Sequence, residues 1–337
     1  MPTPTDGRHF YTADVDDGTV AVVDAVAGVV TARIRAGTSP TSVAVAPDGR
    51  RAFVTNFDDG TVLALDVATG SRGRDAAGSP WSAAAGRSGS RMVVSEQELR
   101  RRWTDGQPCH GLWSLLPGTV TGEVLARTGA DYVVVDLQHG AAAEADLPGV
   151  TTAIAAAGAV PLVRTRSPSF ADVGRPLDLG ARGVIVPTVR DADHAREVVV
   201  ATRYAPAGGR SIGRLSGGSD QPLVIAMVET ATALEDLDAI LAVDGLDGVY
   251  VGPGDLALSL QLTGDGRRAE LRAVLSSIIA RARAAGVPVG VHAYSGEEAG
   301  GYAAEGATIV TVAVDTVSLA GAMTRHLAVT RDRPDQH

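Results

Sequence analysis

The chain has 337 residues, of which 45% are hydrophobic and 20% are charged, so it can bury a substantial core. Its formal net charge of -9 argues against nucleic acid or an anionic membrane as the main partner, because either would favour a basic surface. All 30 basic residues are arginine, and the absence of lysine excludes Schiff-base enzymes, lysine-anchored pyridoxal-phosphate enzymes and P-loop lysines.

Cysteine content and hydropathy indicate where the protein works. Cys109 is the only cysteine, which excludes an intrachain disulfide and a multi-cysteine metal site, and we expect it to be a small buried residue. No run reaches the roughly 18 apolar residues of a membrane span, and residues 1–7 lack the pattern of a signal peptide. These features predict a cytoplasmic protein without a membrane partner.

The beginning of the chain contains a β-rich repeat. The string DDGTV starts at Asp16 and again at Asp58, an offset of 58 − 16 = 42 residues, which is typical of a β-propeller blade. Short alternating strands are predicted between and within the copies, at 42–46 and 51–55. Residues from about 8 to 70 resemble the YVTN-type propeller repeat, with AFVTN at 52–56 in the place of its motif. Fewer than two blades cannot close a propeller, so we predict a partial propeller-like segment, either a remnant or a binding module completed by another chain.

A stretch rich in Gly, Ser and Ala follows this repeat and is typical of a linker. Ser95, with Glu98 three residues later, fits a capping box that opens a short helix through about Trp103. Strands and helices alternate from there to the end of the chain. The predicted parts are a β-repeat segment at 1–70, a linker at 71–94, an α/β domain at 95–330 and a tail at 331–337.

The α/β domain contains eight apolar runs that predict buried parallel strands. They lie near 110–115, 131–136, 159–164, 183–187, 224–229, 247–251, 287–291 and 308–312. The clearest helices between them are predicted at 120–128, 147–157, 192–204, 267–285 and 315–327. Eight strands in about 230 residues match a (β/α)8 TIM barrel. A doubly wound open sheet is the alternative, but no glycine-rich phosphate fingerprint follows any of these strands.

Polar residues follow several of these strands, at the end where barrel enzymes keep their active sites. Glu229 and Asp255 each come at or just after a strand, and two converging carboxylates suit a divalent cation such as Mg2+ or Mn2+. Taken singly, each carboxylate equally fits a helix N-cap or a first helical turn.

Two further strand ends carry groups suited to proton transfer and to anion binding. His139 lies three residues after Asp136, and a histidine with a carboxylate neighbour fits a general base. His292 also ends a strand on this face and is the one serious rival for that role. Arg164 ends another strand, where it can face an anion or a developing negative charge. The backbone N–H groups beside Gly254 offer a place for a carboxylate.

Residues from about 95 to 330 resemble the HpcH/HpaI aldolase and citrate lyase family, in particular its metal-dependent pyruvate aldolases. The matching strings, in chain order, are Asp136-Leu137-Gln138-His139-Gly140, Leu177-Asp178-Leu179-Gly180-Ala181, Val186-Pro187, Arg203-Tyr204 followed by Pro206 and Gly208, Met227-Val228-Glu229-Thr230, and Gly252-Pro253-Gly254-Asp255-Leu256.

This resemblance implies a divalent-metal class II aldolase that cleaves 4-hydroxy-2-oxo acids, dicarboxylic or sugar-derived, to pyruvate and an aldehyde through a metal-stabilised enolate. Mg2+, Mn2+ or Co2+ would be held by two carboxylates, and a homo-oligomer would exchange its terminal helix between barrels. The implied roles are metal binding by Glu229 and Asp255, proton acceptance by His139 with Asp178 raising its basicity, oxyanion stabilisation by Arg164, and pyruvate binding by Met227 and by the backbone of Gly254 and Asp255.

The chain departs from the family pattern at three places. Gln138 stands where many members have Glu, and Met227 stands where the best-known members have Gln. The connection at 210–222 is short and rich in Gly and Ser, which can affect substrate closure or subunit contact. Two alternatives therefore stay open: an acyl-CoA thioester lyase of the same family, and a non-catalytic binding protein with a degenerate barrel.

Overall fold

The computed structural model describes residues 9–15, 17–37, 39–45, 51–56, 61–66, 94–213 and 219–331. The chain divides into two compact units, Met1–Ser90 and Arg91–His337. Almost all of the predicted linker at 71–94 lies outside the described residues, and so does the middle of the short connection at 210–222. No helix in the described ranges is long and apolar enough to cross a lipid bilayer.

The described part of the first unit is all-β. Two three-stranded antiparallel sheets are formed, one by β1 (His9–Asp14), β2 (Thr19–Asp24) and β3 (Val29–Arg35), the other by β4 (Pro40–Val45), β5 (Arg51–Asn56) and β6 (Thr61–Asp66). Buried side chains of both sheets, including Val20, Val54 and Leu65, form one apolar cluster. The strands predicted at 42–46 and 51–55 are confirmed as β4 and β5, whereas the propeller interpretation stays a prediction.

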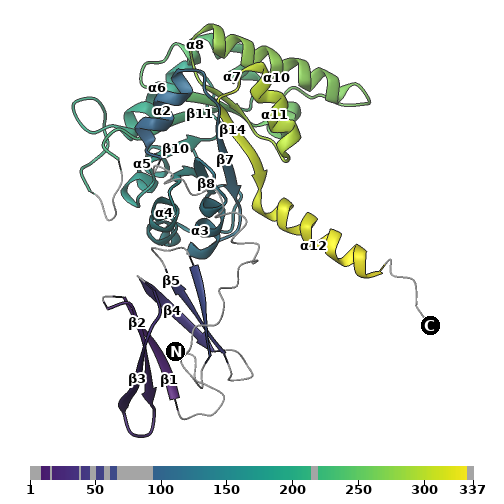
Figure 1. Ribbon diagram of the computed structural model, residues 1–337. Helices are drawn as coiled ribbons and strands as arrows, with labels where there is room; N and C mark the ends of the chain where they lie inside the picture. Colours follow the sequence, from purple (N-terminus) through teal and green to yellow (C-terminus); the bar gives the residue numbers. More distant parts are fainter. Residues whose placement is uncertain are drawn as a thin grey trace. The chain divides into compact units, whose positions relative to one another are not determined.

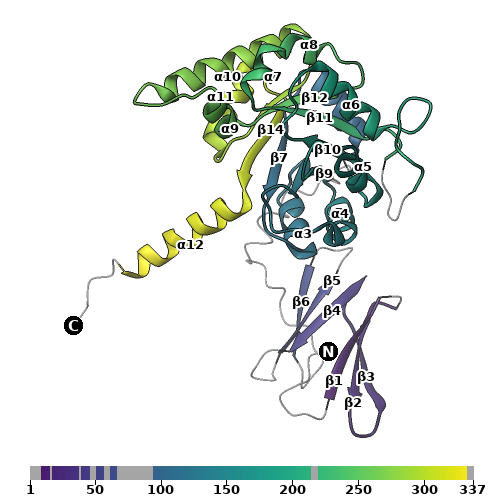
Figure 2. The same ribbon diagram turned by 180° about the vertical axis from the view of Figure 1, so that it is seen from behind.

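The second unit is a (β/α)8 barrel, as predicted (Figures 1 and 2). Within residues 94–213 and 219–331, eight parallel strands close the barrel: β7 (Cys109–Ser114), β8 (Tyr132–Asp136), β9 (Val160–Arg164), β10 (Gly183–Val186), β11 (Leu223–Val228), β12 (Gly248–Val251), β13 (Val289–Val291) and β14 (Ile309–Val314). Each lies within about two residues of its predicted range. Closure of the sheet through the β9–β10 and β14–β7 pairs excludes the doubly wound alternative.

Helices follow the strands around the outside of the barrel. They are α3 (Thr119–Arg127), α4 (Leu147–Ala156), α5 (Phe170–Asp178), α6 (Ala192–Thr202), α7 (Ala231–Glu235), α8 (Leu237–Leu241), α9 (Pro253–Ser259), α10 (Arg267–Ala284), α11 (Gly296–Glu305) and α12 (Asp315–Arg331). The five helices predicted from periodicity are present, and α12 continues four residues beyond its predicted end.

Alternation along each strand divides the buried side chains between two layers. In β8, Tyr132 and Val134 belong to the cluster inside the barrel, while Val133 and Val135 pack in the layer between sheet and helices. In β11, Ile225 and Met227 point inward by the same alternation. The same alternation, continued by two residues, places the side chains of Asp136 at the end of β8 and Glu229 after β11 on the inner side of the barrel.

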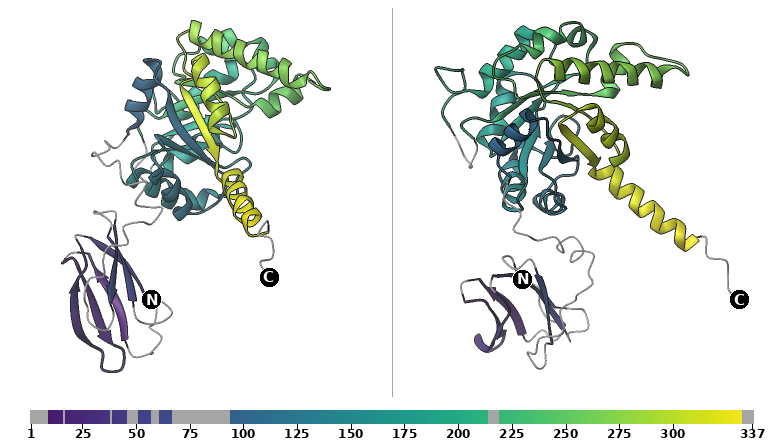
Figure 3. Two further views of the ribbon diagram at one scale, coloured as in Figure 1. Left: turned by 45° about the vertical axis from the view of Figure 1, so that its right-hand side comes forward. Right: turned by 45° about the horizontal axis from the view of Figure 1, so that its top comes forward.

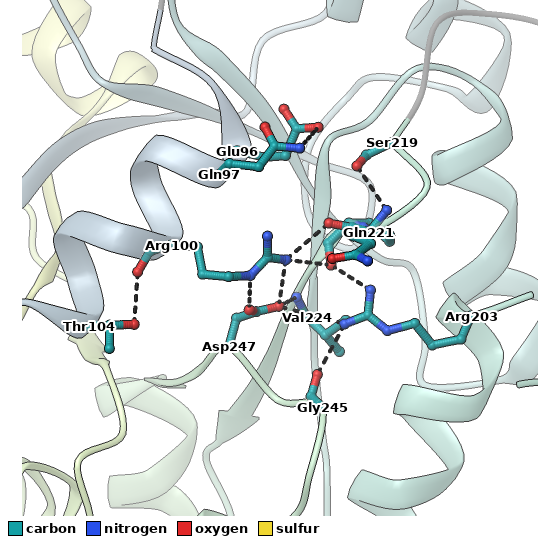
Figure 4. Close-up of polar contacts among 11 residues, drawn as sticks. Glu96, Gln97, Arg100, Thr104, Arg203, Ser219, Gln221, Val224, Gly245 and Asp247 are labelled. Carbon is teal, nitrogen blue, oxygen red and sulfur yellow. Dashed lines mark hydrogen bonds and ion pairs between the residues drawn. The ribbon is translucent and has the colours of Figure 1, made fainter. Parts of the chain in front are cut away.

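A short helix, α2 (Glu96–Thr104), closes the opposite end of the barrel. Its Leu99 and Trp103 are fully buried and join the inner cluster. Arg100 forms an ion pair with Asp247, the residue before β12, with Nε and Oδ1 2.5 Å apart (Figure 4). Asp247 also accepts the backbone N–H of Val224 at 2.8 Å, so one carboxylate holds the helix to two strands.

The start of α2 confirms half of the predicted capping box. The Ser95 hydroxyl accepts the backbone N–H of Glu98 at 3.1 Å. The Glu98 carboxylate does not return to the cap, because it pairs with Arg101 one turn further along, at 2.7 Å. Cys109, at the start of β7, is free and fully buried as expected, and burial raises the pKa of its thiol to about 12.

The last helix leaves the barrel (Figures 1 and 3). Asp315 ties its first residue to the end of β7 by accepting the Ser114 hydroxyl and the backbone N–H groups of Leu115 and Leu116, each at 3.0 Å. Beyond this anchor the helix exposes large apolar side chains, among them Leu319, Met323 and Leu327.

Candidate active site

A cavity of about 230 Å3 opens at the carboxyl ends of the barrel strands. Seven of the eight predicted site residues line it: Asp136, His139, Arg164, Met227, Glu229, Gly254 and Asp255. The remaining lining residues are Trp113, Leu115, Gly252, Pro253, His292, Tyr294, Val314 and Val317. The barrel thus brings together groups that are more than 100 positions apart in the chain.

Asp136 and Arg164 form a buried ion pair on the floor of the cavity. The register of β8 and β9 sets these two residues directly opposite each other. Nε of Arg164 donates to Oδ1 of Asp136 at 3.0 Å, and Nη2 donates to Oδ2. Trp113 fixes the pair from a third strand, because its Nε1 donates to Asp136 at 3.0 Å and its ring lies 5.2 Å from the Arg164 guanidinium. The guanidinium is therefore held in one orientation.

Asp136 also shapes the turn that carries His139. Its Oδ1 accepts the backbone N–H groups of Gln138 at 2.9 Å and of His139 at 3.1 Å, an arrangement typical of an Asx turn. We expected this carboxylate to orient the imidazole itself; instead it is occupied by Arg164, Trp113 and the turn. Gly140 completes the turn, since a Cβ there would lie 2.2 Å from the Asp136 carbonyl oxygen.

Electrostatics keep Asp136 ionised. Burial by itself would raise the pKa of this carboxyl, but hydrogen bonds and charge from Arg164, together with the Trp113 and His139 N–H groups, lower it overall. Asp136 is fully buried, so its negative charge depends on these donors.

Glu229 is the second buried carboxylate, with 2% of its surface exposed. Its Oε1 accepts the backbone N–H of Thr188 at 2.6 Å, and Thr188 adopts a left-handed conformation (φ 50°) that is uncommon for a β-branched residue. Its Oε2 is buried and has no hydrogen-bond partner among the described residues. The pKa of Glu229 is raised, mainly by burial. The hydrogen bond from Thr188 lowers this pKa, whereas the negative charge of the nearby Asp255 raises it further.

Asp255 approaches Glu229 from the first turn of α9. Gly252 caps that helix, and a Cβ at this position would lie 2.6 Å from the unpartnered Oε2 of Glu229, so only glycine lets the two segments come this close. A Cβ at Gly254 would meet nothing within 4 Å, so the backbone next to Asp255 faces open space. Met227, 2% exposed, closes the inner side.

These residues fit a hard divalent cation. Two carboxylates converge, one of them buried with an unpartnered oxygen, and such an oxygen is costly unless it meets a cation or a donor. No group of three or more His, Cys, Asp or Glu able to hold a metal is present in the described part of the chain. A site built on Glu229 and Asp255 would thus leave its other coordination positions to water and substrate oxygens.

Asp178 is the predicted site residue that the structure does not bring to the cavity. It ends α5, where Nη2 of Arg210 donates to its Oδ1 at 2.6 Å and Nε donates at 3.2 Å. The Arg210 side chain is 3% exposed and stacks on Tyr204, at 4.7 Å from the ring centre. Within this chain Asp178 therefore neutralises a buried guanidinium and does not contact His139.

Several residues that line the cavity or hold its lining residues in place were not identified from the sequence. Trp113 and Tyr250 lie in apolar strands and read as core, and only the inward alternation of their strands separates them from outer-layer residues. Thr188 acts through its backbone N–H, which carries no side-chain signal. His292 differs from these residues, because its position after a strand already places it on this face as the rival to His139.

Comparison with known proteins shows what the chain is similar to. Residues 110–322 match the family model for HpcH/HpaI aldolase/citrate lyase. The chain is 37% identical over 247 residues to a hydroxypyruvate/pyruvate aldolase of Rhizorhabdus wittichii, covering 69% of this chain and 98% of that protein. It is 36% identical over 245 residues to a 2-keto-3-deoxy-L-rhamnonate aldolase of Klebsiella pneumoniae, covering 68% of this chain and 92% of that one.

A solved structure supports the same relationship. A HpcH/HpaI aldolase/citrate lyase family protein from Burkholderia cenocepacia superposes with a TM-score of 0.65 at 31% identity, covering 69% of this chain and 99% of that one. The sequence match, the closed barrel and the shared fold agree, and the chain belongs to the HpcH/HpaI aldolase/citrate lyase family.

Proposed function

We propose that the chain is a divalent-metal-dependent class II pyruvate aldolase, which cleaves 4-hydroxy-2-oxo acids to pyruvate and an aldehyde and catalyses the reverse addition. The observation that carries the proposal is the unpartnered, buried Oε2 of Glu229, which lies in one cavity with Asp255, Arg164 and His139. The named relatives are aldolases that act on 2-oxo acids, which supports the same reaction class.

Glu229 and Asp255 would hold the cation, for which Mg2+, Mn2+ and Co2+ are the candidates. When bound, a divalent cation supplies Lewis-acid stabilisation of negative charge on a keto oxygen. The unsubstituted backbone at Gly254 and the N–H of Asp255 would receive the pyruvate carboxylate beside it, with Met227 against the methyl side.

Arg164 would stabilise the oxyanion, and His139 would accept the proton. Arg164 presents a guanidinium that Asp136 and Trp113 already orient, so positive charge is in place where the oxyanion develops. His139 lies exposed at the cavity mouth, and its ring would accept the proton of the 4-hydroxyl group as the carbon–carbon bond breaks. With no lysine in the chain, the imine route to the same products is closed.

Metal-dependent release of pyruvate tests this function. Purified full-length protein is incubated with a panel of 4-hydroxy-2-oxo acids after chelation and after addition of Mg2+, Mn2+ or Co2+, and exchange of pyruvate methyl protons with solvent deuterium is followed by NMR. We expect both activities to require the added metal. Protein that binds metal but neither releases pyruvate nor exchanges its protons would contradict the proposal.

We further propose that the protein is a homo-oligomer and that its first unit is dispensable for turnover. The exposed apolar side of α12 supports subunit association, since such a surface is unfavourable in water. The division of the chain into two compact units at Ser90 supports the proposal that turnover does not need the first unit. Deletion of residues 1–90 should leave kcat and KM for pyruvate release within about twofold; a large loss of turnover would assign the first unit a role in catalysis.

A further inference from the structure

His292 lines the catalytic cavity, but the proposed reaction gives it no role. It follows β13 directly and faces the same space as Arg164 and His139. A side chain capable of hydrogen bonding on the cavity wall affects which substrates fit there. Its contacts determine what it can offer.

The orientation of the His292 ring follows from a hydrogen-bond chain inside the barrel. The Tyr250 hydroxyl donates its proton to Oγ1 of Thr311 at 2.7 Å, so it cannot also donate to His292. Nδ1 of His292 lies 3.3 Å from the same Tyr250 oxygen, which therefore accepts the Nδ1 proton. Neutral imidazole carries one N–H, so Nε2 keeps its lone pair and acts as an acceptor. Because Tyr250 is fully buried, the Nε2 edge is the one turned toward the cavity.

Aromatic neighbours hold the ring in this position. Trp113 and Tyr294 pack edge to face on His292 from two sides, with ring centres 4.8 and 4.9 Å away. Both also line the cavity. The acceptor is thus fixed in a wall that is otherwise aromatic and apolar.

The ring is also kept neutral. Burial, together with the nearby positive charge of Arg164, lowers the pKa of His292 to about 4, while Asp136 acts weakly in the opposite direction. A ring with so low a pKa is a poor base near pH 7, but its neutral form keeps the Nε2 lone pair and can accept a hydrogen bond there. This separates His292 from the proton-transfer role proposed for His139.

We propose that Nε2 of His292 accepts a hydrogen bond from a hydroxyl group on the aldehyde fragment, so that the enzyme favours aldehydes that carry a hydroxyl beside the carbonyl carbon. This inference rests on the aldolase function proposed above. A second carboxylate on the aldehyde fits less well, because Arg164 is the only arginine among the described lining residues and is already paired with Asp136.

The test compares two aldehydes of equal size. Glycolaldehyde and propanal differ by a hydroxyl in place of a methyl group, and each is added to pyruvate by the full-length, metal-loaded protein. The readout is the ratio of the two kcat/KM values within one variant, because fold, metal loading and enolate formation cancel in that ratio. His292→Leu should lower the ratio about tenfold, the effect of one hydrogen bond from a desolvated group. His292→Gln, whose Oε1 can take the place of Nε2, should keep it within about threefold.

Two further variants make the result interpretable. Tyr250→Phe removes the oxygen that accepts the Nδ1 proton and should lower the ratio severalfold without touching the substrate. His110→Leu, at an exposed position at the opposite end of the barrel, should keep the wild-type ratio.

Two outcomes would overturn the inference. If His292→Leu and Tyr250→Phe both keep the wild-type ratio while the wild-type protein exchanges pyruvate methyl protons, the specificity role is wrong and the aldolase function stands. If the wild-type protein with metal exchanges no methyl protons, the aldolase function fails and the specificity role fails with it.

Discussion

At the scale of single residues, the cavity contains two buried carboxylates that are stabilised in different ways. Asp136 is surrounded by donors from Arg164, Trp113 and a backbone turn. Glu229 has one backbone donor and one oxygen without a partner. The first carboxylate is satisfied by the protein itself, whereas the second keeps one buried oxygen without a partner among the described residues, where the proposed cation would bind.

Replacing Glu229 by Gln tests that difference. Gln keeps an oxygen for the Thr188 N–H but removes the charge, so metal-dependent pyruvate release should fall more than about 100-fold. The metal-free variant should melt at or above the wild-type temperature, because an uncompensated buried charge has been removed. Isothermal titration with Mn2+ measures the affinity directly. Glu297→Gln, at an exposed carboxylate in α11, is the control; wild-type affinity in the Glu229 variant would exclude this residue as a ligand.

Asp136 predicts a pH dependence of stability. Its pKa is lower in the folded protein than the ordinary value of 3.8, so the stability that its charge contributes is complete above that value and is lost as the pH falls through the lower folded value. Asp136→Asn lacks this contribution and should unfold about 3 kcal/mol more easily at neutral pH, because Arg164 loses its counter-charge. The difference between the two proteins should shrink in acid.

Urea denaturation at a series of pH values between about 2 and 7 measures this difference. Asp105→Asn, at an exposed carboxylate, serves as the control and should follow the wild-type curve. A difference between wild type and Asp136→Asn that stays constant down to pH 2 would mean that the ion pair with Arg164 does not set the acid stability.

At the scale of elements, the barrel needs a cover at the end opposite the active site. Helix α2 supplies it by burying Leu99 and Trp103 and by pairing Arg100 with Asp247 (Figure 4). Two further ion pairs join α2 to the barrel. Arg102 of the helix pairs with Asp131, the residue before β8, and Glu96 of the helix pairs with Arg182, the residue before β10. The helix is thus tied to strands on several sides of the ring.

Arg100→Ala should therefore weaken the whole barrel. The Asp247 side chain is 9% exposed and would lose its main counter-charge, so we expect the free energy of unfolding to drop by about 1 to 3 kcal/mol. The neighbouring Arg101, on the same helix but 56% exposed, provides a matched control, and Arg101→Ala should change stability far less. Chemical denaturation of both variants checks this. Equal losses would show that helix propensity, and not the Asp247 pair, is responsible.

At the scale of the whole molecule, α12 presents a surface that a single chain leaves uncovered. Leu319, Met323 and Leu327 are about half exposed and recur every four residues, so they form one stripe along the helix. Val317, two residues before Leu319, lines the candidate active-site cavity. Association through α12 would thus take place next to the site.

Charged substitutions on this stripe test association. The double variant Leu319→Asp/Met323→Asp should shift the protein to a smaller species in sedimentation velocity, because carboxylates cannot be buried unpaired in an apolar interface. The control is Ala320→Asp/Thr324→Asp, which places the same charges on exposed positions beside the stripe. An unchanged oligomer in the first variant would exclude the stripe as the interface.

Much of the fold and site could be predicted from the sequence because the signals are local. Eight buried parallel strands read as apolar runs, and their number and spacing indicate a barrel. In a barrel the carboxyl ends of all strands meet on one face, so Asp136, Arg164, Glu229 and Asp255 could be assigned to one site before any contact was known. The absence of lysine excluded the imine mechanism from composition alone.

Other features were decided only by the tertiary structure, because they depend on strand register and on the direction of individual side chains. The β8–β9 register pairs Asp136 with Arg164, so this carboxylate bonds the backbone of His139 but does not orient its imidazole. The end of α5 pairs Asp178 with Arg210, 32 positions later, instead of with the histidine. Inward alternation adds Trp113 to the cavity, although nothing in the sequence of β7 separates it from a core residue. Local pattern determines which segments become strands, whereas contacts between strands determine which partner each polar group at their ends finds.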